Sequence, residues 1–238
     1  MHSIFISDTH LCPTRPAINQ VFFDFLRGPA AQAQALYILG DLFEYWAGDD
    51  DDDPFNASVL MGLRELADRG VALYLMHGNR DFLIGKRFVS ACRAKLLPDA
   101  TMVDLYGTPT LLMHGDTLCT DDVRYLEFRA KVRSPEWQQQ FLAQTLAQRK
   151  QVIADLRSEN AAEKKLKTEE IMDATAAGIE AALRAHAYPR LIHGHTHRPA
   201  LHQHLVDGNK CERWVLADWY TSGSYLHCDN TGCRVLKL

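Results

Sequence analysis

Four short apolar runs in the first half of the chain each stop close to polar residues that can bind a metal. The runs cover residues 4–6, 35–39, 71–76 and 110–113. The polar residues that follow them are, in chain order, Asp8 and His10, Asp41, Asn79, and His114. Helical segments alternate with the runs, which is typical of an α/β fold. Because the carboxyl ends of neighbouring parallel strands meet at one edge of a sheet, we expect these side chains to converge.

The spacing of apolar residues predicts the other elements. Helices are expected over 19–26, 57–69 and most of 82–95, and further strands over 190–192, 212–216, 222–226 and 233–236. Residues 123–186 differ from the rest, because only Pro135 and Gly178 interrupt a stretch rich in Ala, Gln, Glu, Lys, Arg and Leu. We therefore predict one domain, residues 1–238, that carries a helical insertion over 123–186.

The charge of the chain is unevenly distributed. Residues 1–122 carry 9 basic and 17 acidic residues, net −8, whereas residues 123–170 carry 10 basic and 7 acidic residues, net +3. This asymmetry suggests cation binding in the first part and an anionic partner for the second. The overall net charge of −4 argues against a nucleic-acid-binding protein. The acidic run 49–53 is interpreted as a solvated loop.

Composition also bears on the compartment. The apolar stretch at residues 3–7 is too short for a signal peptide, and no run is long enough to cross a membrane. The six Cys contain no CxxC pair, so we expect reduced thiols in a cytoplasmic protein. A zinc site formed by Cys211, Cys228 and Cys233 is the alternative, which their spacing does not favour.

The block Gly194-His195-Thr196-His197 adds two imidazoles to the residues that follow the strands. The resulting set has seven candidate ligands: Asp8, His10, Asp41, Asn79, His114, His195 and His197. A mixture of imidazole, carboxylate and amide without thiolate suits Mn, Fe, Zn, Ni or Co. Seven ligands are too many for one ion but suit two ions about 3.5–4 Å apart that share a bridging carboxylate. The alternative is seven unrelated polar residues that cap helices or line turns.

In this order, these blocks resemble the calcineurin-like metallophosphoesterases. The matching blocks are Asp8-x-His10, Gly40-Asp41, Gly78-Asn79-Arg80-Asp81, His114 and Gly194-His195-Thr196-His197. The resemblance implies an α/β fold of four layers, α/β/β/α, with a dinuclear site at the strand ends. It also implies that one metal takes Asp8, His10, Asp41 and His197, and that the other takes Asp41, Asn79, His114 and His195. Asp41 would then bridge the two ions.

Arg80 departs from the pattern of most of the superfamily, which has a His at this position. In phosphodiesterases that His is placed to protonate a poor alkoxide leaving group. An arginine keeps its proton because its pKa lies above about 12, and it supplies fixed charge and paired hydrogen bonds to phosphate oxygens. Arg80 therefore indicates cleavage of a pyrophosphate, whose leaving group is already a phosphate. The structural alternative is that Arg80 only pairs with Asp81.

Within the superfamily, the segments SDTHL, GDLFEYW, HGNRDFL and LMHGD and the helical insertion are similar to the UDP-2,3-diacylglucosamine pyrophosphohydrolases of lipid A biosynthesis. This resemblance implies hydrolysis to 2,3-diacylglucosamine 1-phosphate (lipid X) and UMP, by attack of a hydroxide held by the metals on the α-phosphorus. It implies two Mn²⁺ ions, with other divalent transition metals possible. Asp41, Asn79 and Arg80 would be catalytic. Substrate contacts would fall at Asn79, Arg80, Asp122, Asn160, Lys164, Lys167 and His195.

The insertion would then form a lipid-binding cap. Its apolar wall would consist of Trp137, Phe141, Leu142, Leu146, Val152, Ile153 and Leu156, and its cationic groups would be Arg157, Lys164, Lys165 and Lys167. Ordinary helix packing and a solvated lysine face are the alternatives. The lipid substrate implies peripheral association with the anionic cytoplasmic side of the inner membrane, and we expect a monomer. Two rival functions are a general or cyclic-nucleotide phosphodiesterase and a metal-free binding scaffold.

Overall fold

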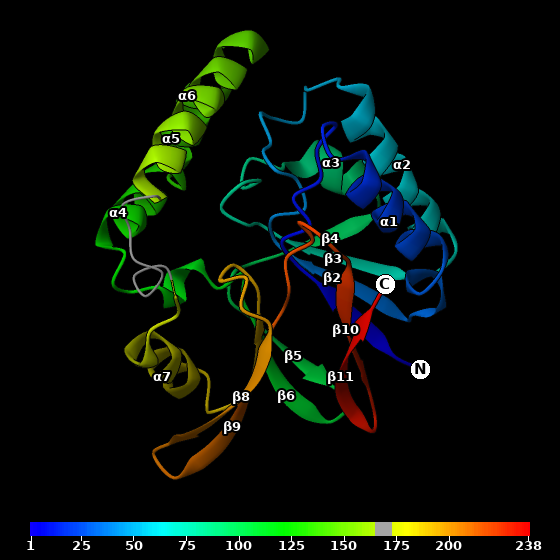
Figure 1. The fold of residues 1–238 in the computed structure, drawn as a ribbon, viewed down its shortest axis with the longest axis vertical. Helices are drawn as coiled ribbons and strands as arrows, with labels where there is room; N and C mark the ends of the chain where they lie inside the picture. Colours follow the sequence, from blue (N-terminus) through cyan, green and yellow to red (C-terminus); the bar gives the residue numbers. More distant parts are fainter. Residues whose placement is uncertain (165–172) are drawn as a thin grey trace.

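In the computed structural model, which describes residues 1–164 and 173–238, two sheets pack face to face between helices (Figure 1). The first sheet has the order β11-β10-β1-β2-β3-β4, in which β1 to β4 run parallel. Its strands are β1 (Ser3–Ile6), β2 (Ala35–Leu39), β3 (Ala72–Met76), β4 (Ala94–Leu97), β10 (Ser224–Asp229) and β11 (Gly232–Lys237). The order β5-β6-β7-β9-β8 describes the second sheet, in which β6, β7 and β9 are parallel. Its strands are β5 (Thr101–Leu105), β6 (Thr108–Leu112), β7 (Arg190–His193), β8 (Ala200–Val206) and β9 (Asn209–Val215).

Helices cover the outer faces of both sheets. The first layer contains α1 (Pro16–Arg27), α2 (Pro54–Asp68) and α3 (Lys86–Ala91). The segment after β6 forms α4 (Val123–Val132), α5 (Pro135–Leu142) and α6 (Leu146–Lys164), and α7 (Ala176–Ala185) lies beside the second sheet (Figure 1). Short 3₁₀ turns occupy Ala30–Gln32 and Asp116–Leu118. Within the described residues, no helix combines the length and the apolar character that a membrane span needs.

Three hydrophobic clusters hold these layers together. On β1, Ile4 and Ile6 face the first helical layer, whereas Phe5 faces the second sheet. The strands read as continuous apolar runs because both of their faces are buried. In the third cluster, Ile179 and Leu183 of α7 pack on the second sheet, so α7 forms the outer layer there. The structure therefore has the four layers expected from the sequence.

Three strands of this fold were not predicted. The region 82–95 was expected to be mostly helical, but only Lys86–Ala91 is helical, and Ala94–Leu97 pairs with β3 as an edge strand. β5 and β8 are the two edge strands of the second sheet. An edge strand has one strand neighbour and keeps exposed positions, so its sequence lacks the continuous apolar run of a central strand. The prediction failed where that signal was weak.

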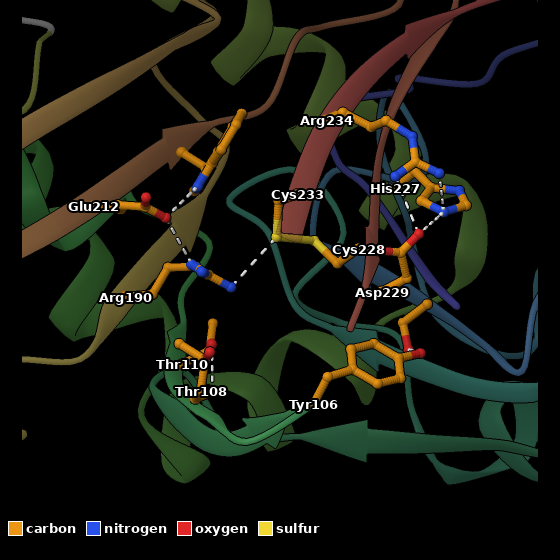
Figure 2. Close-up of a disulfide and its surroundings, with 12 residues drawn as sticks. Tyr106, Thr108, Thr110, Arg190, Glu212, His227, Cys228, Asp229, Cys233 and Arg234 are labelled. Atoms are coloured by element: carbon orange, nitrogen blue, oxygen red, sulfur yellow. Dashed lines mark hydrogen bonds and ion pairs between the residues drawn. A yellow bond between two sulfur atoms is a disulfide. The ribbon is translucent and has the colours of Figure 1, made fainter. Parts of the chain in front are cut away.

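The expectation of six reduced thiols is wrong for two of them. Cys228 on β10 and Cys233 on β11 face each other in the antiparallel pair and are joined by a disulfide (Figure 2). Cys12, Cys92, Cys119 and Cys211 are buried and lie outside this disulfide. The Arg190 guanidinium on β7 donates to Cys233 Sγ at 3.4 Å, so this contact also links the two sheets.

The acidic run 49–53 is a docking point rather than a solvated loop. The Asp49 carboxylate accepts hydrogen bonds from the backbone of Gly85 (2.8 Å) and Phe88 (3.0 Å), at the start of α3. From α6, the buried Arg149 pairs with Asp50. On the same helix, Lys150 Nζ lies 2.8 Å from Asp51 Oδ1. These contacts fix the first turns of α6 against the loop that follows β2.

Candidate metal centre

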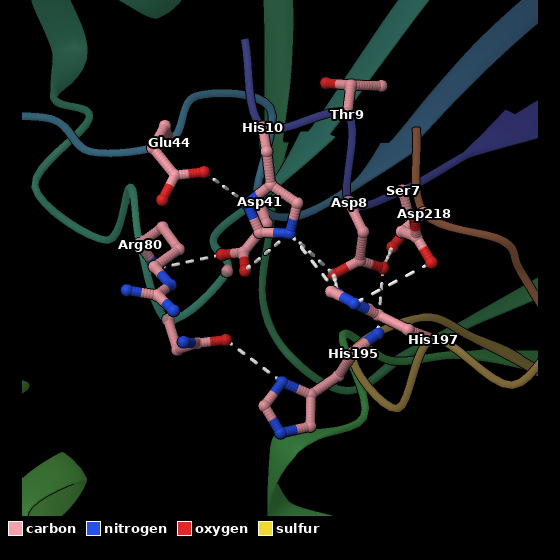
Figure 3. Close-up of polar contacts among 12 residues, drawn as sticks. Ser7, Asp8, Thr9, His10, Asp41, Glu44, Arg80, His195, His197 and Asp218 are labelled. Atoms are coloured by element: carbon pink, nitrogen blue, oxygen red, sulfur yellow. Dashed lines mark hydrogen bonds and ion pairs between the residues drawn. The ribbon is translucent and has the colours of Figure 1, made fainter. Parts of the chain in front are cut away.

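The seven predicted ligands come together where the carboxyl ends of the two sheets meet. Asp8, His10, Asp41 and Asn79 follow β1, β2 and β3 of the first sheet, and His114, His195 and His197 follow β6 and β7 of the second. Two groups have ligand atoms within 4.8 Å of one another: Asp8, His10 and His197, and Asp8, Asp41 and His114. Figure 3 shows the carboxylates and imidazoles pointing toward one another. The convergence expected from the strand ends is therefore present.

Asn79 joins the remaining residues to these two groups. Its Oδ1 lies 3.0 Å from His114 Nε2 and 3.0 Å from His195 Nδ1. On the other side, His10 Nε2 lies 3.3 Å from His197 Nε2, and His197 Nε2 lies 3.3 Å from Asp8 Oδ1. A ring nitrogen and an amide oxygen so arranged have lone pairs available to a cation between them.

The hydrogen bonding of the site is suited to a bound cation. Asp8 is completely buried, and although His197 Nε2 lies 3.3 Å from its Oδ1, no group in the described part of the chain donates a well-aligned hydrogen bond to that oxygen. His10 Nδ1 is also buried without a hydrogen bond there, but it faces Glu44 rather than the centre. A buried polar atom without a partner costs about 1–3 kcal/mol, so native proteins rarely retain one without reason. A divalent cation bound by these nitrogen and oxygen donors would satisfy Asp8.

The electrostatics of the site point the same way. Burial raises the pKa of Asp41 to about 7, and the nearby Asp8 and Asp81 carboxylates add to this effect. Burial also opposes the charge on Asp8, but the imidazoles of His197, His114 and His10 outweigh it and lower its pKa. For His114, the Asp41 and Asp8 carboxylates overcome burial and raise the pKa to about 9. The two buried carboxylates therefore need positive charge beside them.

The backbone is held in an unusual conformation at five of the seven residues. Asp8, His10, Asp41, His195 and His197 all have φ between +47° and +66°. Each such residue costs of order 1–3 kcal/mol and persists only when its surroundings fix it. Here the surroundings include bonds between the ligand loops, such as His10 N to Asp41 O (2.9 Å) and His195 N to Asp8 Oδ2 (2.8 Å).

Two glycines are required by the close approach of these loops. A side chain at Gly78 would overlap the Asp41 carboxylate and backbone, and one at Gly194 would overlap Ser7 and the Asp8 carboxylate. Each of these glycines directly precedes a candidate ligand, Asn79 or His195. The Gly in the GN and GH blocks is therefore explained by packing between loops.

Asp81 is a functional residue that the sequence reasoning missed. Its carboxylate is completely buried and accepts hydrogen bonds from four backbone N–H groups on the two ligand loops. These are the N–H groups of Gly78 (2.8 Å), Asp41 (3.3 Å), Leu42 (2.8 Å) and Phe43 (3.4 Å). Asp81 thereby fixes Asp41 relative to Asn79. The signal in the sequence was an acidic residue directly after Asn79-Arg80.

Arg80 is therefore not the ion-pair partner of Asp81. Its backbone N–H donates to Asp41 Oδ1 at 2.8 Å, so the residue is fixed beside the centre (Figure 3). No carboxylate pairs with its half-buried guanidinium within residues 1–164 and 173–238. A positive charge with this freedom can contact a phosphate bound at the centre.

The structure shows no substrate-binding role for the other predicted contact residues among those it describes. The Asp122 carboxylate accepts from Tyr125 N at 3.2 Å and caps the start of α4. Asn160 and Lys164 lie on α6, but their side chains are not described, and Lys167 lies outside the described residues, as does Lys165. These contacts stay predictions.

Helix α4 contributes contacts to the centre that the sequence did not reveal. Arg129 donates to the buried Asp116 (2.7 Å) and to Asp99 (3.1 Å), directly beyond His114. The Tyr125 hydroxyl donates to Asp116, and its ring stacks on His195 with centroids 6.0 Å apart. At the end of α4, Arg133 donates to Gly78 O at 2.9 Å. The insertion is thus in contact with ligand loops of both sheets.

A family model and the curated relatives of this chain point to the same family. Residues 1–199 match the family model described as calcineurin-like phosphoesterase. A protein of Aromatoleum aromaticum named UDP-2,3-diacylglucosamine hydrolase is 54% identical over 98% of this chain and 95% of its own length. A protein of Cellvibrio japonicus with the same name is 49% identical over 98% of this chain and 97% of its own.

A solved structure with little sequence similarity has the same fold. A dimetal phosphatase from Danio rerio superposes with a TM-score of 0.51 at 12% identity and covers 100% of this chain and 98% of its own. The sequence resemblance to the superfamily is confirmed by the family match and by the relatives. The chain belongs to the calcineurin-like phosphoesterase family and, within it, groups with the UDP-2,3-diacylglucosamine hydrolases.

Proposed function

We propose that this chain hydrolyses the pyrophosphate bond of UDP-2,3-diacylglucosamine and releases UMP and 2,3-diacylglucosamine 1-phosphate. The observation that carries the proposal is the Arg80 guanidinium, which lies beside a seven-residue metal centre and has no carboxylate partner among the described residues. The name of the relatives, at 54% and 49% identity over nearly the full chain, supports the choice of substrate.

The ligands divide into two sets that share Asp41. Following the family resemblance, one set would be Asp8, His10, Asp41 and His197, and the other would be Asp41, Asn79, His114 and His195. The two compact groups in the structure itself share Asp8 instead. We propose Mn²⁺ as the ion at both positions. Divalent ions bound there would lower the pKa of a water molecule and neutralise charge on the phosphate. The two oxygens of Asp41 would serve both positions, because Oδ2 lies 3.9 Å from His10 Nε2 and Oδ1 lies 3.9 Å from His114 Nε2.

Arg80 would act on the leaving group. In the reaction, a bond forms between the water oxygen and the α-phosphorus, and the bond from the α-phosphorus to the bridging oxygen breaks. The bridging oxygen leaves with the lipid 1-phosphate and gains negative charge. A fixed guanidinium can stabilise that charge with paired hydrogen bonds, and it does not need to give up its proton.

The insertion would bind the acyl chains, and this assignment rests on its exposed apolar residues. Val123 and Phe128 on α4 are 58% and 38% exposed, and Leu142 at the end of α5 is 42% exposed. By contrast, Phe141 is buried in the core, and Trp137 stacks on it with centroids 4.7 Å apart, so that part of the predicted wall holds the insertion in place. Because the substrate is a lipid, we propose a cytoplasmic protein that meets the inner membrane peripherally, and we propose separately that it is a monomer.

The test is to measure UMP release from UDP-2,3-diacylglucosamine and hydrolysis of a p-nitrophenyl phosphodiester, each with Mn²⁺ added. We expect UMP release and little diesterase activity. Arg80→Ala should keep its metal and lose about 10²–10³ in kcat, the usual effect of removing one donor to developing charge. Arg64→Ala, which removes an ion pair with Asp68 and a hydrogen bond to Ala91 O in the outer helical layer, is the matched control and should keep parental kcat. Strong diesterase activity without UMP release would favour a general phosphodiesterase instead.

A further inference from the structure

We propose that Glu44 is a positioning residue that orients the His10 imidazole for the metal centre. The inference rests on the proposed function only in requiring that the centre bind metal ions. Glu44 lies three residues after Asp41, within the GDLFEYW segment, and it is 9% exposed although no role has been given to it so far. A buried carboxylate directly beside a candidate ligand calls for a specific reason.

The two nitrogens of His10 face different surroundings. Nε2 lies 3.3 Å from His197 Nε2 and 3.9 Å from Asp8 Oδ1, so it faces the centre. Nδ1 points away from the centre and lies 3.5 Å from Glu44 Oε2 (Figure 3). If Nε2 is the ligand atom, the neutral ring carries its proton on Nδ1, and that N–H needs an acceptor. Glu44 Oε2, at 3.5 Å, is not yet within hydrogen-bond geometry of Nδ1, but a small movement of the ring toward it would make it the acceptor. A carboxylate in this place would fix the ring and increase its basicity as a ligand.

The surrounding residues hold both partners in place. The Tyr220 ring stacks on the His10 ring with centroids 4.9 Å apart. The Arg15 guanidinium lies over Tyr220, donates to the backbone oxygen of His10, and donates to Glu44 Oε2 at 2.8 Å. Arg15 therefore holds Glu44 Oε2 beside the imidazole of His10. A carboxylate that served only to pair with a surface arginine would not need this arrangement.

The second oxygen of Glu44 connects the centre to the insertion. Arg157 on α6 donates to Glu44 Oε1 at 2.7 Å, and its guanidinium lies over the Tyr45 ring. Arg15 and Arg157 together compensate the buried charge of Glu44. The orientation of His10 and the position of α6 therefore depend on the same carboxylate.

The test is metal affinity, which does not require the lipid substrate. The metal-free protein is titrated with Mn²⁺, and free Mn²⁺ is measured by its electron paramagnetic resonance signal. For Glu44→Gln we expect one of the two Mn²⁺ dissociation constants to rise by about 10–100-fold, the usual effect of removing a hydrogen-bond partner of a ligand. Glu212→Gln, which alters a half-exposed carboxylate paired with Arg190, should leave both constants within twofold.

Two further variants separate orientation of His10 from ion pairing. Arg157→Gln removes the contact with α6 but leaves the carboxylate facing His10, so its Mn²⁺ affinity should stay within threefold of the parent. Glu44→Asp keeps the charge but shortens the side chain, and it should raise one Mn²⁺ dissociation constant as Glu44→Gln does. This second variant keeps the test valid if the Glu44→Gln protein does not fold. Unchanged affinity in both Glu44 variants, or equal weakening in Arg157→Gln, would overturn the proposal. A parent protein that binds no Mn²⁺, Zn²⁺ or Ni²⁺ would refute the metal centre itself and this inference with it.

Discussion

Replacing Asp81 by Asn tests whether this one carboxylate holds the metal centre together. Asp81 Oδ1 accepts from Gly78 (2.8 Å) and Asp41 (3.3 Å), and Oδ2 accepts from Leu42 (2.8 Å) and Phe43 (3.4 Å). An Asn side chain offers one acceptor oxygen and one NH₂ group. Whichever way it turns, it loses one short and one long bond, and its NH₂ group then faces two N–H donors.

The magnitude follows from these contacts. Losing a hydrogen bond to a charged group costs about 1.5–3 kcal/mol, and leaving a buried N–H without a partner costs about 1–3 kcal/mol. Removing the negative charge also relieves repulsion with Asp41, so a net loss of about 3 kcal/mol is expected. For a chain of this length that loss lowers Tm by about 6–12 °C.

Urea unfolding of the metal-free protein measures the loss directly, and metal content after dialysis against limiting Mn²⁺ measures the effect on the centre. We expect the Asp81→Asn protein to lose both stability and metal. The control is Asp155→Asn on the exposed face of α6, where Gln151 is the one donor to the carboxylate among the described residues, and this change should stay within about 0.5 kcal/mol. A loss below 1 kcal/mol for Asp81→Asn would show that the ligand loops are held by other contacts.

Three other substitutions address separate parts of the structure. Asp41→Ala should remove activity and metal content together. It should also raise the stability of the metal-free protein, because a buried carboxylate is removed. Retention of two ions, measured by mass spectrometry, would contradict the bridging role of Asp41. Arg149→Ala should cost about 2–4 kcal/mol by leaving Ala47 O without its donor, and should speed hydrogen exchange in α6 without changing metal content. Gly194→Ala should weaken Mn²⁺ binding in a titration, because the new methyl group would overlap Ser7 and displace the His195 loop, and parental affinity would show that the loop adapts.

The central strands and all seven candidate ligands could be predicted because their signals are local. Ile4–Ile6 and Ala35–Leu39 read as strands because both of their faces are buried. The ligands follow such strands directly, in blocks that resemble a known family. The prediction of a mostly helical segment over 82–95 was wrong because Leu83, Ile84 and Phe88 are apolar at helical spacing, although the chain turns before α3 begins at Lys86.

The supporting residues could not be predicted in this way, because their partners are distant in sequence. Asp81 accepts from residues about forty positions earlier in the chain, and Glu44 pairs with Arg157 more than one hundred positions later. Nothing in the local sequence around Glu44 indicates that helix α6 will reach it. The Cys228–Cys233 pair is different, since a short turn between two strands places the two residues opposite each other, and that signal was present in the sequence.

The charge asymmetry of the chain now has a different explanation. It suggested a cation site in the acidic part and an anionic partner for the basic insertion, but much of that charge is paired internally. The pairs between the insertion and the first part of the chain are Arg149–Asp50, Lys150–Asp51, Arg157–Glu44 and Arg129 with Asp99 and Asp116. These arginines and this lysine hold the insertion on the core, so they are poor candidates for binding an anionic lipid. Arg80 has no carboxylate partner among the described residues, so its charge is available to a phosphate. We therefore propose that Arg80 recognises the diphosphate of the substrate.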